Sequence, residues 1–130
     1  LSLSLSLSLK LTRCLSLKIS GEVKNTGALA GSDVVQVYIR PANASVPWPL
    51  LQLSGFTRVF LQPRQLSTLS FTLTPAQMAV VRQYDLAKEV QPITFQVFLG
   101  GGLPGDPKVR SNTLSTTFTI VGSPTLLSQC

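Results

Sequence analysis

The sequence contains no histidine and few acidic residues, and these shortages exclude several kinds of active site. Without histidine, no Ser/His/Asp or Cys/His arrangement can form. Only five of the 130 residues are acidic, against eleven Lys and Arg, so the net charge is +6. The acids are Glu22, Asp33, Asp85, Glu89 and Asp106. Their spacing places no two of them on either side of a glycosidic bond, so we expect no catalytic residues in this chain.

Cysteine is scarce as well. Cys14 and Cys130 stand near opposite ends of the chain and lack the paired spacing of zinc ligands, so we expect no metal site. They could form one disulfide if the two ends of the fold meet. Two unrelated thiols fit the sequence at least as well.

Runs of charge and long apolar runs are also missing. The basic residues stand singly, which argues against a nucleic-acid partner. No stretch reaches the roughly 18 apolar residues of a membrane span, so we expect no membrane partner. The chain begins with Leu1 and shows no signal-peptide pattern, so we interpret it as a fragment.

Alternation of apolar and polar residues dominates what is present, and this is the period of a β-strand. It predicts strands in residues 33–40, 54–61, 66–74, 93–100 and 113–121, with one or two more before residue 24. The expected core residues are Val35, Val37, Ile39, Leu69, Phe71, Leu73, Ile93, Phe95, Val97, Leu99, Leu114, Phe118 and Ile120. About seven strands of this kind predict an all-β, immunoglobulin-like antiparallel β-sandwich.

One short helix interrupts the strands. In "TPAQMAVVRQ" Thr74 can cap the helix, Pro75 suits its first position, and Gln77 completes a capping box. We expect this helix to carry the chain from one sheet to the other.

The chain divides into a main domain and two short ends. Residues 1–13 are a low-complexity Leu-Ser segment, interpreted as a tail or a first strand. Fully extended, residues 1–23 would span about 75 Å, so this segment must break. We expect the domain itself at residues 14–122 and a C-terminal tail at residues 123–130.

Trp48 is the candidate for a binding residue, because two stiff prolines, Pro47 and Pro49, hold its loop. Its indole could dock into a neighbouring domain, stack on a sugar ring, or cover the edge of its own core. In a sugar-binding module, Tyr38 or Tyr84 would complete the aromatic platform.

Three further motifs bear on function. "NAS" at residues 43–45 makes Asn43 a possible N-glycosylation site. "GGGLPG" at residues 100–105 formally matches a dinucleotide fingerprint, but Pro104 and Pro107 prevent the helix that this site requires, so we expect no cofactor. "NTGALAG" at residues 25–31 is interpreted as a turn in which Asn25 and Gly27 suit positive φ. Asp33 then marks the start of a strand.

Four separated blocks, "VKNTGALAGSDVVQVYI", "LSGFTRVFLQP", "LSFTLTPAQ" and "ITFQVFLGGG", resemble the C-terminal fibronectin type III-like domain of glycoside hydrolase family 3 enzymes. The resemblance covers about residues 23–121, and "GGGLPGDP" is similar to the β-xylosidase and α-arabinofuranosidase branch. The chain departs from the family at Arg64 and Gln65, where Gly-Glu is usual, and at Ile93, where Gly usually follows proline.

The resemblance implies a non-catalytic role. In such enzymes the aspartate nucleophile and the glutamate acid/base lie in preceding domains, and nothing here matches those motifs. It implies a non-catalytic accessory domain of a β-xylosidase-like parent enzyme, which hydrolyses O-glycosyl bonds in xylan breakdown. It also implies that this parent is secreted or located in the cell wall. Its partners would be the catalytic domains and, in addition, polysaccharide. The alternatives are an autonomous carbohydrate-binding or adhesion module and an inactive gene copy.

Overall fold

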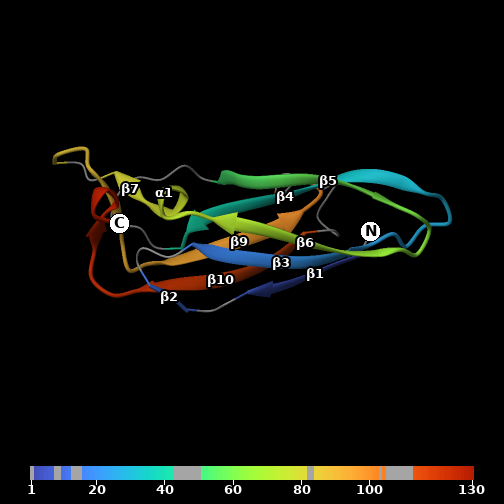
Figure 1. The fold of residues 1–130 in the computed structure, drawn as a ribbon, viewed down its shortest axis with the longest axis horizontal. Helices are drawn as coiled ribbons and strands as arrows, with labels where there is room; N and C mark the ends of the chain where they lie inside the picture. Colours follow the sequence, from blue (N-terminus) through green and yellow to red (C-terminus); the bar gives the residue numbers. More distant parts are fainter. Residues whose placement is uncertain are drawn as a thin grey trace.

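A computed structural model describes residues 2–7, 10–12, 16–42, 51–81, 84–102, 104 and 113–130 as a long β-sandwich whose main strands run along its length (Figure 1). The three-stranded sheet has the order β1 (Ser2–Leu7), β3 (Leu17–Lys24), β6 (Leu66–Leu73). The five-stranded sheet has the order β2 (Lys10–Thr12), β10 (Leu114–Val121), β9 (Thr94–Gly100), β4 (Gly31–Pro41), β5 (Gln52–Leu61). The predicted all-β sandwich is therefore confirmed.

The N-terminal segment breaks, as its length requires, and its pieces join different sheets. β1 pairs antiparallel with β3 in the three-stranded sheet, whereas β2 pairs parallel with β10 in the five-stranded sheet. The β2–β10 pair is the departure from the purely antiparallel arrangement that we expected. It arises because the chain crosses between the sheets at β2 and returns at β3, so that β2 runs in the same direction as β10.

The core lies between the two sheets and follows the predicted alternation. Leu17, Ile19, Val23, Leu69, Phe71 and Leu73 are buried from the three-stranded sheet. Val35, Val37, Ile39, Leu61, Phe95, Val97, Leu99, Phe118 and Ile120 are buried from the five-stranded sheet. Of the expected core residues only Ile93 and Leu114 are half-buried. The rings of Phe95 and Phe118 stack at the centre, with centroids 5.3 Å apart.

The predicted helix is present as α1 (Pro75–Met78), a single turn after β6. The Gln77 side chain accepts the backbone N–H of Thr74 at 2.9 Å, as the capping box predicts, and donates to the Ser54 carbonyl of β5 at 2.9 Å. α1 leads from the three-stranded sheet into a small third sheet of β11 (Thr125–Leu126), β8 (Lys88–Val90) and β7 (Val80–Val81). This sheet lies at the end of the molecule where the C-terminus is marked (Figure 1).

The C-terminal residues are folded onto this end. β11 pairs with β8, the 3-10 helix Leu127–Gln129 follows it, and Leu127 packs against the core. Cys130 is disulfide-bonded. Cys14 lies outside the described residues. The domain boundaries themselves stay a prediction.

The turn between β5 and β6 holds Arg64 in the left-handed region, at φ 63°. This conformation costs an L-residue about 1–2 kcal/mol, and only glycine adopts it freely. The turn is fixed from both sides, because the Arg64 N–H donates to the Asn25 carbonyl at 2.8 Å and the Gln65 N–H to the Gln62 carbonyl at 3.0 Å.

We expect Arg64→Gly to raise the free energy of unfolding by about 0.5–1 kcal/mol, because relief of strain exceeds the entropy that glycine adds to the unfolded chain. Urea unfolding measures it. Arg64→Ala is the matched control, since it removes the charge and keeps the strain. A glycine variant no more stable than the alanine variant contradicts the prediction.

Candidate functional site

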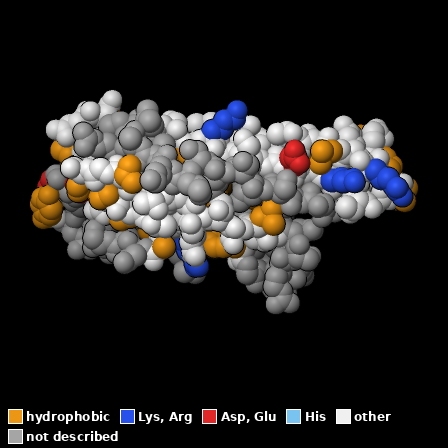
Figure 2. Space-filling view, turned by 90° about the horizontal axis from the view of Figure 1, so that it is seen from below, with side chains coloured by type: hydrophobic (Ala, Val, Ile, Leu, Met, Phe, Trp, Pro, Cys, Tyr) orange, Lys and Arg blue, Asp and Glu red, His pale blue; other side chains and the backbone are white. Residues whose placement is uncertain are grey.

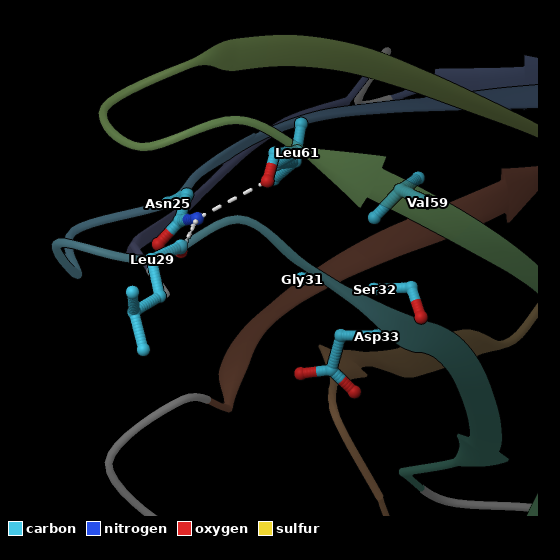
Figure 3. Close-up of a pocket in the computed structure, with 7 residues that line it drawn as sticks. All are labelled: Asn25, Leu29, Gly31, Ser32, Asp33, Val59 and Leu61. Carbon is cyan, nitrogen blue, oxygen red and sulfur yellow. Dashed lines mark hydrogen bonds between the residues drawn. The ribbon is translucent and has the colours of Figure 1, made fainter.

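A half-open pocket of about 160 Å³ lies where β4 begins, beside the end of β5 (Figure 3). Its lining residues are Asn25, Leu29, Gly31, Ser32, Asp33, Val59 and Leu61. The β3–β4 connection supplies Asn25 and Leu29, β4 supplies the next three, and β5 supplies the last two. The pocket is formed because this loop folds back over the strand ends.

Asn25 holds the loop in place. Its side-chain amide donates to the carbonyls of Leu29 at 2.8 Å and Leu61 at 3.2 Å (Figure 3). Its side-chain oxygen accepts the Gly27 N–H at 2.9 Å. Neither Asn25 nor Gly27 has positive φ, so that expectation is wrong. The residue acts through its side chain, which makes an Asx turn and ties β3 to β5.

The polar groups of the pocket do not form a catalytic set. Asp33 is its one carboxylate, and this side chain accepts the N–H of Val34 at 2.8 Å. The Ser32 hydroxyl accepts a hydrogen bond from the Arg58 guanidinium at 3.0 Å, and among the hydrogen bonds of the described residues it donates to no base that could take its proton. Asp33 lies near the start of β4, as expected. The hydrogen bonds of Asn25 hold the loop beside the pocket.

The structure separates the predicted binding residues. Tyr38 lies half-buried on β4 and its hydroxyl donates to the Gln36 side chain at 2.7 Å. Tyr84 is 80% exposed in the turn between β7 and β8, at the small sheet. Trp48 and Asn43 lie outside the described residues. Tyr38 thus belongs to the five-stranded sheet and Tyr84 to a turn of the small sheet, and their role in binding stays a prediction.

The sequence reasoning missed a group of exposed apolar residues on β5. Leu53, Phe56 and Phe60 are 47%, 70% and 62% exposed and lie on the outer face of the five-stranded sheet. The strand itself was expected, but not the direction of its phenylalanines. The alternation itself was visible in the sequence, since Phe56, Arg58 and Phe60 alternate with Thr57, Val59 and Leu61. Which of the two sets faces inward came only from the structure, in which Leu61 is buried and Val59 packs against the core.

In the part of the chain that the structure describes, acidic and metal-binding side chains form no further candidate site. No group of three or more His, Cys, Asp or Glu side chains gathers there as a metal site would require. Within the same residues, no helix has the length and apolar character needed to cross a membrane. On the long side drawn in Figure 2, hydrophobic side chains occur in small separate groups, and basic side chains outnumber acidic ones.

Residues 33–102, more than half of the chain, match the family model of the fibronectin type III-like domain. This chain belongs to the fibronectin type III-like domain family. The match runs from Asp33, the third residue of β4, to just beyond the end of β9, and so includes β5 and β6.

Curated relatives of this fibronectin type III-like domain include glycosidases. It is 41% identical over 88 residues to a beta-xylosidase of Formosa agariphila, covering 68% of this chain and 12% of the relative. It is 33% identical over 84 residues to thermostable beta-glucosidase B of Acetivibrio thermocellus, covering 65% and 11%. The chain therefore spans only about one eighth of the length of these relatives.

Solved structures of glycosidases contain a domain with the same fold as this chain. A beta-glucosidase of Listeria innocua aligns with a TM-score of 0.81 at 27% identity, over 94% of this chain and 16% of that one. A family 3 beta-glucosidase of Bifidobacterium adolescentis, 21% identical over 92% of this chain and 17% of that one, shares the fold with a TM-score of 0.76. The resemblance to the domain found in family 3 glycoside hydrolases is thereby confirmed.

Proposed function

We propose that this chain is a non-catalytic accessory domain that braces the catalytic domains of a larger family 3 glycoside hydrolase. The observation that carries the proposal is the share of each chain covered. Most of this domain aligns with glycosidases, yet it corresponds to 12% of the Formosa agariphila beta-xylosidase and 16% of the Listeria innocua beta-glucosidase. A domain that makes up so small a share of such an enzyme fits a supporting role.

The chemistry of the chain supports the same role. Retaining and inverting glycosidases of the usual kind need two carboxyl groups about 5–9.5 Å apart, one on each side of the scissile bond. Among the residues that line the pocket at β4, Asp33 is the one carboxylate, and the hydroxyl of the adjacent Ser32 accepts a hydrogen bond from Arg58. Hydrolysis would then be carried out by the rest of the polypeptide.

The finer assignment is to a β-xylosidase-type parent in xylan breakdown, located outside the cell or in the cell wall. Support comes from the beta-xylosidase relative at 41% identity. The disulfide at Cys130 supports an oxidising compartment, because such bonds persist mainly in secreted proteins.

The direct test is to assay the purified 130-residue chain on aryl β-xylosides and aryl β-glucosides. We expect no turnover above a no-protein blank. Turnover that persists through purification and is lost in Asp33→Asn would overturn the proposal, with Glu22→Gln on the far sheet as the matched control. Retention of the chain on insoluble xylan, lost in Trp48→Ala, would point instead to an autonomous carbohydrate-binding module.

A further inference from the structure

The two outer faces of the sandwich carry different kinds of side chain. On β3 and β6 the outward side chains are charged or carry hydroxyl groups, with one apolar exception. They include Lys18, Glu22, Lys24, Leu66, Thr68 and Thr72, all of them exposed. This composition is that of a surface that remains in water.

The opposite outer face, over β5, β4 and β9, is built from aromatic, aliphatic and arginine side chains. Its main residues are Leu53, Phe56, Arg58, Phe60, Tyr38 and Phe98. Among the described outward positions of these three strands there is no Lys, Asp or Glu. Protein interfaces are enriched in aromatics and Arg and depleted in Lys, Asp and Glu in the same way.

Polar side chains hold part of this face in a fixed arrangement. The Arg40 guanidinium donates to the Gln96 side chain at 2.6 Å and lies 5.4 Å from the centre of the Phe98 ring. Tyr38 is fixed by its bond to Gln36. Side chains ordered before association lose less entropy when a partner covers them.

We propose that this face docks against another domain of the same glycosidase polypeptide, with Phe56 and Phe60 at the centre of the contact. The inference rests on the proposed function, which supplies the occupant: in the relatives, most of the polypeptide lies outside the segment that matches this chain. Arg58 adds a charge requirement. Its guanidinium donates to Ser32 and, within the described residues, pairs with no carboxylate, so the partner surface presents an acidic group opposite it.

Two other occupants fit the face less well. Two copies of a chain with a net charge of +6, joined face to face about a twofold axis, would bring like-charged surfaces and both copies of Arg58 together. A sugar platform needs free polar groups beside its aromatic rings, and the polar side chain between Phe56 and Phe60, Arg58, already donates to Ser32.

Hydroxyl-radical footprinting tests the proposal. The oxidation rates of Phe56, Phe60 and Leu66 are compared between this chain alone and the complete polypeptide that carries it. We expect the rates of both phenylalanines to fall about fivefold or more in the complete polypeptide, because the core of an interface excludes water. Leu66, exposed on the other outer face, is the control and keeps its rate.

Two matched variants give a functional readout. Phe60→Ser and Leu66→Ser each remove one exposed apolar side chain from an outer face, at 62% and 55% exposure. In the chain alone both variants keep the wild-type melting temperature. In the complete polypeptide, Phe60→Ser shortens the thermal inactivation half-life of glycosidase activity about tenfold, as loss of an interface anchor does, and Leu66→Ser leaves it unchanged.

The other outcomes overturn one proposal or the other. If a different face of this domain becomes protected while Phe56 and Phe60 do not, the docking face is wrong and the accessory role stands. If no residue becomes protected and deletion of this domain leaves the half-life unchanged, the accessory role itself fails. Protection in the chain alone, with a dimer mass in light scattering, assigns the face to a second copy. Protection only after addition of soluble xylan assigns it to a polysaccharide. Either result overturns the inference.

Discussion

Replacing Phe95 with alanine is expected to lower the free energy of unfolding by about 3–5 kcal/mol, the range for a fully buried phenylalanine. Phe95 is 0% exposed, and its ring stacks on Phe118 with an interplanar angle of 13°. The change removes the buried apolar surface of the ring and leaves a cavity between the two sheets. It also abolishes a ring contact worth about 0.5–1.5 kcal/mol. Small domains are stable by only about 5–15 kcal/mol, so this variant loses a large share of its stability.

Phe56→Ala is the matched control, because it deletes the same atoms from a side chain that is 70% exposed. In the chain alone it should change stability by no more than about 0.5 kcal/mol. Phe95→Leu should cost less than Phe95→Ala, since more of the volume remains filled. Urea unfolding followed by tryptophan fluorescence measures all three, and equal losses for Phe95→Ala and Phe56→Ala would contradict the assignment of the core.

The second large effect concerns Cys130. We expect Cys130→Ser to lower the free energy of unfolding by about 2–5 kcal/mol, because the disulfide restricts the unfolded chain. Cys130 is itself exposed, so loss of packing contributes little to the effect. The only other cysteine in the sequence is Cys14, which gives a clear stoichiometry: no free thiol in the denatured, unreduced chain and two after reduction.

A double-mutant cycle separates the bond from the side chains. Cys14→Ser and Cys130→Ser should cost the same, and the double variant should cost no more than either alone, since both single changes remove one and the same bond. Reduction of the wild-type chain should bring its denaturation midpoint to that of the variants. One reactive thiol in the unreduced wild type, or additive losses, would contradict the pairing.

The strands and the core were predictable because their signal is local. Alternation at Val35, Val37 and Ile39, or at Phe95, Val97 and Leu99, requires only that every second side chain points the same way. The capping of α1 by Thr74 and Gln77 is likewise encoded within four residues. The family resemblance, carried by blocks far apart in the chain, was confirmed by a match over residues 33–102.

The candidate sites were less predictable, for physical reasons. Asn25 looked like a turn residue that tolerates positive φ, but its importance lies in a hydrogen bond to Leu61, 36 positions away. The placement of Tyr38 on the five-stranded sheet and of Tyr84 in a turn of the small sheet depends on which strands pair with one another. Local propensity carries no information about either.

By itself, the sequence determined that this protein is a β-sandwich without histidine chemistry, which residues share a face of each strand, and the family to which it belongs. The tertiary structure alone decided that β1 and β2 enter different sheets, that Cys130 is disulfide-bonded, and that Phe56 and Phe60 face outward. Period two states which side chains lie together, whereas burial depends on what the rest of the chain places opposite them. For that reason the surface inferred to contact a partner became visible only once the two outer faces could be compared.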